Sequence, residues 1–417
     1  MKFIIEGGQK LEGEIRVAGY KNAATPIIAS TLLTKEPCVI NNVPRISDVD
    51  AMLAILESMG SSAQWSGPNQ VTIHNDNIDV SKLDQTLMKR LRSSILLLGP
   101  LLARCEDFVI AEPGGCIIGN RPLDTHFLGM QAMGATITPA VNSYRVVRSS
   151  LKATTIVLLE ASVTATENIV MAATAAEGTT VIKNAACEPH VQDLCNALVG
   201  MGAKIEGIGT TTVSVAGGVS LKGMTHALIP DAIEAGTFII MGVATHSRLT
   251  VSHLRPDHID VVLATLQNMG AQLEIGDTYV KTEPSLSLVA RRINAQPYPA
   301  IPTDLQSLFG VLATQVNGTS LIHDTMFEGR MGYIGELIKM GANAIVCDPH
   351  RVLVTGPTPL YGQEIRSFDL RAGAAMIVAG LLAQGTTTIN QAELVDRGYE
   401  QIDQRLAQLG ALIQRVE

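Results

Sequence analysis

Apolar and polar residues follow the same order six times along the chain. In the third occurrence, small and apolar residues with helical spacing come first, at 167–176, and a short β-branched run follows at 179–182. A second, amphipathic helical stretch comes next, and two short strands around a polar turn, at 203–205 and 212–215, complete the pattern. The pattern predicts six copies of one helix–strand–helix–strand–strand repeat.

The second helical stretch of every repeat ends in Met-Gly or Leu-Gly followed by Ala or Ser. These glycines are spaced by 74, 68, 68, 71 and 69 residues, and they are Gly60, Gly134, Gly202, Gly270, Gly341 and Gly410. Glycine is the residue that most often ends a helix, so each is expected to be the C-cap of its second helix.

The sixth repeat stops one strand short, after residues 412–416. Residues 2–8 at the N-terminus resemble the final strand of the third repeat at 213–218. We therefore expect the N-terminus to supply the missing strand, which argues against an open solenoid of independent repeats. Residues 21–229 would form one domain of three repeats, and residues 1–20 with 230–417 the other.

Composition narrows the class of protein. Of the 417 residues, 46% are hydrophobic and 17% are charged, as in an ordinary globular protein. A net charge of −8 argues against a broad nucleic-acid surface. The N-terminus lacks the apolar core of a signal peptide, and apolar runs such as 372–383 fall short of the ~20 residues that span a bilayer. The six cysteines show neither C-x-x-C nor metal-ligand spacing, which favours reduced thiols in the cytoplasm.

Cations recur at equivalent places in the repeats. Lys21, Arg92 and Arg371 stand where a first helix begins, although a positive charge there opposes the helix dipole. Arginines also precede the terminal glycine by 11 to 15 residues in five repeats, at Arg45, Arg121, Arg255, Arg330 and Arg397. A solvated surface charge is the alternative for any single arginine. Their recurrence predicts an interdomain cleft for an anionic substrate, lined by Lys21, Arg92, Arg121, Arg330, Arg371 and Arg397.

Three further residues are candidates for acid–base or nucleophilic chemistry. Asp304 and Asp369 each stand beside the start of a first helix, where an N-cap is the alternative role. Cys116 lies in a glycine-rich stretch at 113–124, five residues before Arg121. A thiol near cations can act as nucleophile or acid, whereas an incidental cysteine in a surface turn is the alternative.

Taken together, these motifs resemble the enolpyruvyl transferase family, and within it the UDP-N-acetylglucosamine 1-carboxyvinyltransferases. The resemblance runs the whole length and is carried by Lys21-Asn22-Ala23-Ala24, Gly114-Gly115-Cys116-x-x-Gly119-x-Arg121-Pro122-x-Asp124-x-His126, Pro302-Thr303-Asp304-x-Gln306 and Asp396-Arg397-Gly398-Tyr399-Glu400. It implies an α/β fold of two inside-out barrel domains, each with three repeated β-α-β-α-β-β units in pseudo-threefold symmetry. It also implies a transferase of peptidoglycan and cell-wall synthesis, and hence of cell division, that is a target of fosfomycin.

The same resemblance implies a role for each matching residue. Lys21 and Asn22 would contact phosphoenolpyruvate, Arg121 and Arg397 would hold its phosphate and carboxylate, and Cys116 would protonate it or add to it. The expected contacts of the UDP-sugar are Arg92, Arg121, Pro122, Leu123, Asp124, Thr125, Ser162, Val163, Asp304 and Met326.

The remaining expected roles belong to carboxylates and cleft arginines. Asp304 is placed to take the proton of the sugar 3-hydroxyl, and Asp369 is a second proton-transfer candidate. Arg330 and Arg371 match further substrate-binding positions of the cleft. Lys21 and Arg397 count among the catalytic residues as well as the binding residues. This chemistry requires neither a metal ion nor a cofactor.

Four residues depart from the family pattern: Tyr20, Asn120, Thr164 and Leu394. They leave two alternatives open beside transfer of the enolpyruvyl group to the 3-hydroxyl of UDP-N-acetylglucosamine. One is a 3-phosphoshikimate-type carboxyvinyltransferase, although that branch lacks the Gly-Gly-Cys stretch. The other is a non-catalytic nucleotide-sugar-binding relative.

Overall fold

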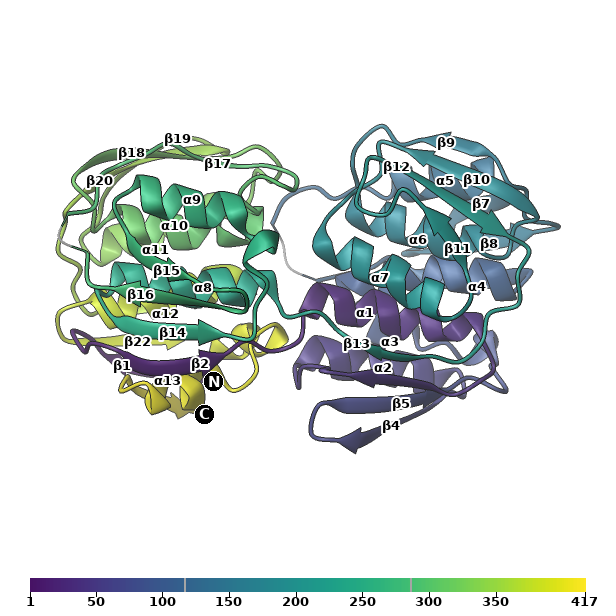
Figure 1. Ribbon diagram of the computed structural model, residues 1–417, viewed down its shortest axis with the longest axis horizontal. Helices are drawn as coiled ribbons and strands as arrows, with labels where there is room; N and C mark the ends of the chain where they lie inside the picture. Colours follow the sequence, from purple (N-terminus) through teal and green to yellow (C-terminus); the bar gives the residue numbers. More distant parts are fainter. Residues whose placement is uncertain (116–117, 286) are drawn as a thin grey trace. The chain divides into compact units, whose positions relative to one another are not determined.

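The computed structural model describes residues 1–115, 118–285 and 287–417 (Figure 1). The chain divides into two compact units. Unit 1 contains Met1–Ala18, Cys116–Asn120 and Pro230–Glu417, and unit 2 contains Gly19–Gly115 and Arg121–Ile229. The chain thus passes from unit 1 to unit 2 after Ala18 and returns at Pro230, apart from the short segment of unit 1 that ends at Asn120.

The six repeats of the sequence are present as six helix pairs. The first helices are α1 (Lys21–Ser30), η3 with α4 (Arg92–Leu97 and Leu98–Arg104), α6 (Val163–Ala173), α8 (Ala232–Ala244), α10 (Gln306–Ala313) and α12 (Leu370–Leu382). The second helices are α2 (Ser47–Ser58), α5 (Asp124–Ala132), α7 (Pro189–Gly200), α9 (Asp260–Asn268), α11 (Tyr333–Lys339) and α13 (Ile402–Gln408). Shorter helical turns are η1 (Thr31–Leu33), η2 (Val80–Lys82), α3 (Gln85–Met88), η4 (Pro256–His258), η5 (Thr303–Leu305), η6 (Arg330–Gly332) and η7 (Ala392–Arg397).

Each repeat contributes one sheet, and in the described part of the chain five sheets have four strands and one has three. In unit 2, the first sheet has the strand order β13 (Thr225–Ala227), β3 (Cys38–Asn41), β5 (Gln70–His74), β4 (Ser62–Gly67). The second sheet has the order β6 (Asp107–Ala111), β8 (Ser143–Arg148), β7 (Ala135–Ala140). The third has the order β11 (Lys204–Glu206), β12 (Thr212–Gly217), β10 (Gly178–Lys183), β9 (Thr155–Val157). In unit 1, the sheet of the fourth repeat has the strand order β15 (Gln272–Ile275), β16 (Tyr279–Glu283), β14 (Arg248–Ser252), β2 (Glu12–Arg16). The sheet of the fifth has the order β17 (Ile293–Ala295), β18 (Gly318–Asp324), β20 (Arg351–Gly356), β19 (Asn343–Asp348). The sheet of the sixth has the order β21 (Glu364–Arg366), β22 (Thr386–Asn390), β1 (Lys2–Glu6), β23 (Leu412–Val416).

The repeated glycines end the second helices, but not as C-caps. The C-cap is the preceding Met or Leu, for example Met201 after α7 and Leu409 after α13. The glycines follow it with φ between 95° and 105°, at Gly60, Gly134, Gly202, Gly270, Gly341 and Gly410. Only glycine adopts this left-handed conformation without strain, so the conformation explains why the same residue returns in all six repeats.

The predicted closure by the N-terminus is confirmed. Strand β1 lies between β22 and β23 and pairs antiparallel with both, with Phe3 opposite Ile389 on one side and Arg415 on the other. The first strand of the chain therefore completes the sheet of the last repeat.

Two strands are exchanged between distant repeats, which the sequence pattern did not predict. Strand β2 precedes α1 in the chain, but it pairs in parallel with β14 of the fourth repeat. Strand β13 precedes α8, but it pairs in parallel with β3 of the first repeat. The second repeat has no such leading strand among the residues described, because the chain before η3 forms η2 and α3 instead.

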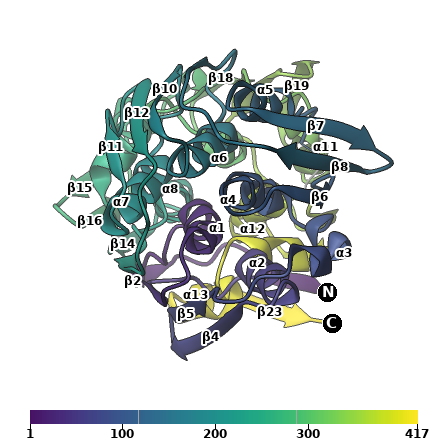
Figure 2. The same cartoon turned by 90° about the vertical axis from the view of Figure 1, so that its right-hand side faces the viewer.

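Helices occupy the centre of each unit, and sheets lie around them. In unit 1, α8, α10 and α12 contact one another, and each packs on its own sheet. Every residue of α8 is buried, as expected for a helix that is apolar on all sides. Figure 2 faces unit 2 with α1, α4 and α6 inside and the hairpins β4–β5 and β7–β8 at its periphery. This mixed α/β architecture agrees with the inside-out fold expected from the sequence.

Over the residues described, the structure contains no helix that is both long enough and apolar enough to cross a membrane.

Candidate functional site

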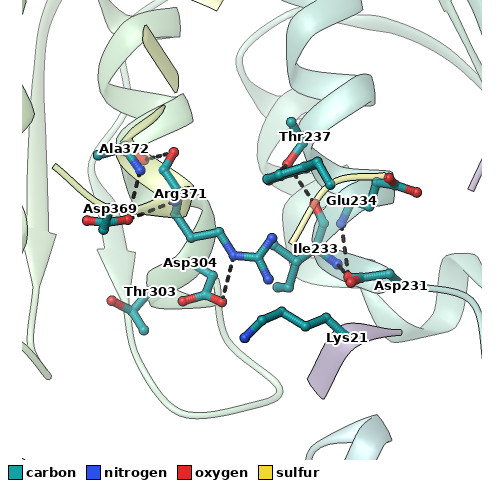
Figure 3. Close-up of polar contacts among 12 residues, drawn as sticks. Lys21, Asp231, Ile233, Glu234, Thr237, Thr303, Asp304, Asp369, Arg371 and Ala372 are labelled. Atoms are coloured by element: carbon teal, nitrogen blue, oxygen red, sulfur yellow. Dashed lines mark hydrogen bonds and ion pairs between the residues drawn. The ribbon is translucent and has the colours of Figure 1, made fainter. Parts of the chain in front are cut away.

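The Asp304 carboxylate of unit 1 is held between two arginines. Its Oδ1 lies 2.8 Å from Nη2 of Arg330, and its Oδ2 accepts a hydrogen bond from Nε of Arg371 at 3.0 Å. The side chain of Asp304 is 20% exposed, whereas those of Arg330 and Arg371 are 10% and 3% exposed. Figure 3 shows Arg371 reaching from the start of α12 to this carboxylate. The Asp304 carboxylate is therefore partly accessible and is held against two buried arginines.

Asp304 is not the N-cap of its helix, so the alternative role considered for it does not hold. The turn η5 begins after Pro302, and no side chain caps it. Asp304 is the second residue of that turn, which leaves both carboxylate oxygens available for ion pairs.

Arg371 is part of a buried network behind Asp304. Its guanidinium lies 5.3 Å from the ring centre of Tyr399, whose hydroxyl lies 2.8 Å from Oγ1 of Thr237. Burial by itself lowers the pKa of Arg371, but Tyr399 and the Asp304 carboxylate outweigh it and raise this pKa above its usual value. Arg371 therefore stays charged beneath Asp304. Its Nη1 is buried without a hydrogen-bond partner in the described part of the chain.

Asp369 takes the role of an N-cap. Its Oδ1 accepts hydrogen bonds from the backbone N–H groups of Arg371 at 2.7 Å and Ala372 at 3.0 Å (Figure 3). Asp231 caps α8 in the same way, through the N–H groups of Ile233 and Glu234. The structure thus assigns Asp369 a structural function, and its expected part in proton transfer stays a prediction.

The segment that carries Met326 and Arg330 lies next to η5. Arg330 donates from Nη1 to the carbonyl oxygen of Thr303 at 3.1 Å, and the side chain of Met326 is exposed. Between these two residues, Oε1 of Glu328 accepts a hydrogen bond from the backbone N–H of Asn120 at 2.8 Å. In unit 1 the structure therefore brings Asp304, Arg330 and Arg371 into direct contact, and Met326 lies on the segment that leads to Arg330.

In unit 2, Lys21 and Asn22 form the first turn of α1. Nζ of Lys21 lies 3.0 Å from Oδ2 of Asp48, and both side chains are largely buried. Asp48 lies in the first turn of α2 and was not singled out from the sequence, where an acidic residue near a helix start is ordinary. Asp48 fixes the Lys21 ammonium at the start of α1.

Arg92 connects the start of η3 to the chain before α5. It donates from Nη2 to the carbonyl oxygen of Arg121. Burial lowers the pKa of Arg92, while the nearby Glu112 opposes that effect. The residues after Arg121 lead into α5, with Pro122 and Asp124 exposed and Leu123 buried. Arg92 therefore contacts the start of the 121–125 run.

Two side-chain hydrogen bonds join the start of α5 to the chain before α6 and to the first turn of α6. Thr125 donates to Glu160 Oε1 at 3.1 Å, and Nε2 of His126 lies 2.8 Å from Oγ1 of Thr164. These bonds place the 121–125 run beside Ser162, the N-cap residue of α6, and Val163, the first residue of that helix.

His126 is a packed side chain rather than an exposed ligand contact. It is 2% exposed, and burial lowers its pKa to about 3, so the ring is neutral at pH 7. Its partner Thr164 is one of the departures from the family pattern. A second departure, Tyr20, is buried edge-on against His190, with the ring centres 5.1 Å apart. Both residues thus have structural partners in unit 2.

The glycine-rich stretch lies against backbone on both sides of the undescribed residues. A Cβ at Gly114 would overlap the carbonyl oxygen of Lys89, and Gly115 has φ +105° next to Arg92. Beyond the gap, the carbonyl oxygen of Ile118 accepts the N–H of Gly329 at 3.0 Å. The predicted catalytic residue Cys116 lies outside the described residues.

Two of the five recurring arginines have local structural roles. Arg45 donates to the carbonyl oxygens of Gly67 and Pro68 and stacks on Trp65, with 3.4 Å to the ring centre. Arg255 pairs with Asp257, two residues away, at the surface. Recurrence therefore indicated a common place in the repeat, but not a common ligand. Arg397 lies half-buried at the end of η7.

Within the described ranges, no group of three or more His, Cys, Asp or Glu side chains is arranged to hold a metal ion.

Comparison with known proteins adds a family to this geometry. The model of the EPSP synthase (3-phosphoshikimate 1-carboxyvinyltransferase) family matches residues 5–406. UDP-N-acetylglucosamine 1-carboxyvinyltransferase of Bradyrhizobium diazoefficiens is 43% identical over 424 residues, covering 100% of this chain and 98% of that protein. UDP-N-acetylglucosamine 1-carboxyvinyltransferase 1 of Carboxydothermus hydrogenoformans is 42% identical over 415 residues, with 100% and 98% covered.

Solved structures share the fold. The enolpyruvyl transferase NikO from Streptomyces tendae has a TM-score of 0.90 at 26% identity, covering 100% of this chain and 98% of that one. EPSP synthase from Acinetobacter baumannii has a TM-score of 0.78 at 21% identity, with 100% of both chains covered. The latter similarity is one of fold.

Proposed function

Because the chain belongs to the EPSP synthase (3-phosphoshikimate 1-carboxyvinyltransferase) family, we propose that it transfers the enolpyruvyl group of phosphoenolpyruvate to the 3-hydroxyl of UDP-N-acetylglucosamine, with release of phosphate. The observation that carries this proposal is identity of 43% along the full chain to a relative named for that reaction. The product would enter peptidoglycan synthesis.

The proposed chemistry is addition followed by elimination. A proton adds to C3 of phosphoenolpyruvate, C2 becomes electrophilic, and the sugar 3-oxygen bonds to C2 as its own proton leaves. The tetrahedral intermediate then loses phosphate from C2 and a proton from C3, which restores the double bond. Fixed cations that meet the developing charge usually contribute the largest part of such catalysis.

Asp304 is the proposed acceptor of the 3-hydroxyl proton. Its carboxylate is paired with Arg330 and Arg371, yet its side chain is 20% exposed and so accessible to a hydroxyl group. Lys21, Asn22, Arg121 and Arg397 are the proposed contacts of phosphoenolpyruvate. Lys21 is supported by its fixed ion pair with Asp48, which orients the ammonium.

Phosphate release separates this function from the alternatives. The purified chain with phosphoenolpyruvate and UDP-N-acetylglucosamine is expected to release phosphate, and the same mixture with shikimate 3-phosphate is not. Release with shikimate 3-phosphate alone would identify the other branch of the family. Release with neither acceptor would favour a binding protein that has kept the fold.

Cys116 is the proposed acid or covalent nucleophile, and its reactivity can be tested directly. Fosfomycin should add one equivalent of its mass to the protein, faster when UDP-N-acetylglucosamine is bound. Cys116→Ala should abolish the adduct, whereas Cys347→Ala, which removes an exposed thiol elsewhere, should leave it intact. Full turnover by Cys116→Ala would remove this thiol from the mechanism.

A further inference from the structure

Asp324 is a buried carboxylate that the proposed chemistry does not use. It ends β18 and is 0% exposed. Its Oδ1 accepts the backbone N–H groups of Met326 at 2.9 Å and Phe327 at 3.1 Å, and its Oδ2 accepts the hydroxyl of Thr303. An ionised carboxylate only accepts hydrogen bonds, so these three donors match it.

The partners of Asp324 lead to Asp304 along two routes. Thr303, which donates to Asp324, directly precedes Asp304 in η5. Met326 and Phe327 begin the segment that ends at Arg330. Arg330 closes the ring, because it pairs with Asp304 at 2.8 Å and donates to the carbonyl oxygen of Thr303 at 3.1 Å.

The backbone of Asp324 is itself anchored to the neighbouring strand connection. The N–H of Asp324 donates to the carbonyl oxygen of His350 at 2.9 Å. In return, Nδ1 of His350 lies 2.7 Å from the carbonyl oxygen of Asp324. Since a carbonyl oxygen only accepts, Nδ1 of His350 carries the proton. The Asp324 carboxylate is thus attached to the sheet, while its partners carry the residues of the candidate site.

We propose that Asp324 is a positioning residue that fixes Asp304 and Arg330 relative to each other for proton transfer. The proposal rests on the proposed function of Asp304 as proton acceptor. Complete burial excludes Asp324 from contact with a substrate, so it acts only through Thr303 and the 326–330 segment. Displacement of a catalytic group by about 1 Å can lower the rate about 100-fold.

A pair of substitutions at Thr303 tests this role with little change to the core. Thr303→Val removes the hydroxyl that Asp324 accepts, and Thr303→Ser keeps it. The valine variant is expected to lower kcat about 30- to 100-fold with KM for phosphoenolpyruvate changed less than about twofold. The serine variant should recover most of that loss. Thr319→Val is the matched control, because it removes a threonine hydroxyl bonded to Thr355 at the other end of β18.

Three kinetic results would overturn the proposal. They are a kcat of Thr303→Val equal to that of the unchanged protein, an equal loss in the valine and serine variants, and a raised KM with kcat unchanged. A loss of the same size in Thr319→Val would also do so, since the effect would not depend on Asp324.

Hydrogen exchange tests the positioning without turnover. In Asp324→Ala, which removes the acceptor of both N–H groups, the amides of Met326 and Phe327 should exchange at least about tenfold faster, while amides of α8 such as Phe238 keep their rates. Unchanged exchange at Met326 and Phe327 would overturn the role of Asp324. If the unchanged protein releases no phosphate with either acceptor, the proposed function fails and this exchange measurement alone decides on Asp324.

Discussion

The starts of the fifth and sixth repeats contain the same residue type but differ in chemistry. Asp304 and Asp369 both stand at the beginning of a buried first helix and both were acid–base candidates. Asp369 caps α12 with its Oδ1, whereas Asp304 places its two oxygens against Arg330 and Arg371. An equivalent place in a repeat therefore does not determine what a carboxylate does.

The difference follows from where each residue stands relative to the helix. Asp369 has the extended conformation of an N-cap, with φ −154° and ψ 176°, so its side chain folds back over the first N–H groups. Asp304 is already inside the turn η5, one residue after its first position, and its two oxygens pair with Arg330 and Arg371 instead of capping the turn. A shift by two residues from the cap converts a structural carboxylate into one that can meet a substrate.

Asp304→Asn is the largest test of this contrast. It keeps the shape of the side chain but removes the proton acceptor, so kcat should fall about 10²- to 10⁴-fold. Steady-state phosphate release measures this fall, with Asp369→Asn as the matched control at the other helix start. A loss of less than tenfold in Asp304→Asn would show that the accessible carboxylate is not the acceptor.

Arg371→Met tests how much the buried arginine beneath Asp304 contributes to the stability of the fold. Removing the more buried of its two partners leaves the Asp304 carboxylate with Arg330 alone, and unfolding in urea should show a loss of about 2–3 kcal/mol. Arg255→Met breaks an exposed pair with Asp257 and should change stability by less than about 0.5 kcal/mol. Equal effects in the two variants would mean that burial does not distinguish them.

His126 in unit 2 is a buried titratable group without a proposed catalytic role, and it serves as a comparison for Asp304. Its burial should make the stability of the protein depend on pH. Burial holds the pKa of His126 at about 3, below its value of 6.5 in the unfolded chain. Between these values the unfolded state binds the proton and the folded state does not, so stability decreases as pH falls from 6.5 toward 3. The slope from this one group should reach at most about 1.4 kcal/mol per pH unit.

His126→Gln should reduce that slope in urea unfolding measured between pH 7 and pH 5. An unchanged slope would show that His126 is protonated in the folded state.

The smallest expected effect concerns Asp369 alone. Asp369→Ala removes the cap of α12 and should cost about 1 kcal/mol of stability, while Asp369→Asn should cost only a few tenths. Thermal unfolding measures both. If Asp369→Asn keeps its stability but loses kcat about tenfold or more, Asp369 takes part in proton transfer as well as capping, and the contrast with Asp304 narrows.

Much of the fold could be predicted because its signals are local. A φ near +100° at a helix end strongly favours glycine whatever the surroundings, so the spacing of Gly60 and its five equivalents revealed the repeat. The alternating strand at the N-terminus revealed that the sixth sheet was incomplete, and β1 fills it. The exchange of β2 and β13 between repeats left no such signal, because a short parallel strand has the same pattern in either sheet.

The candidate site was predictable only in part. Lys21 and Arg92 were found because a positive charge at a helix start opposes the helix dipole, and Asp304 was found because it stands in a motif that resembles the family. Asp48 and Asp324 were missed because an acidic residue near a helix or strand end is common in any protein. Arg45 and Arg255 recur with the other arginines but pair locally, and the partner of Arg45, Trp65, becomes visible only when the chain is folded.

The sequence by itself thus determined the repeat, the closure of the sixth sheet, the family and the set of charged residues. These depend on backbone conformation, on alternation and on residue type, all of which act over a few positions. Only the tertiary structure decided which charges meet, because partners such as Asp304 and Arg371 lie far apart in the chain. It also decided that Asp304 remains partly accessible between buried arginines, while Asp369, two residues earlier relative to its own helix, caps that helix through Oδ1.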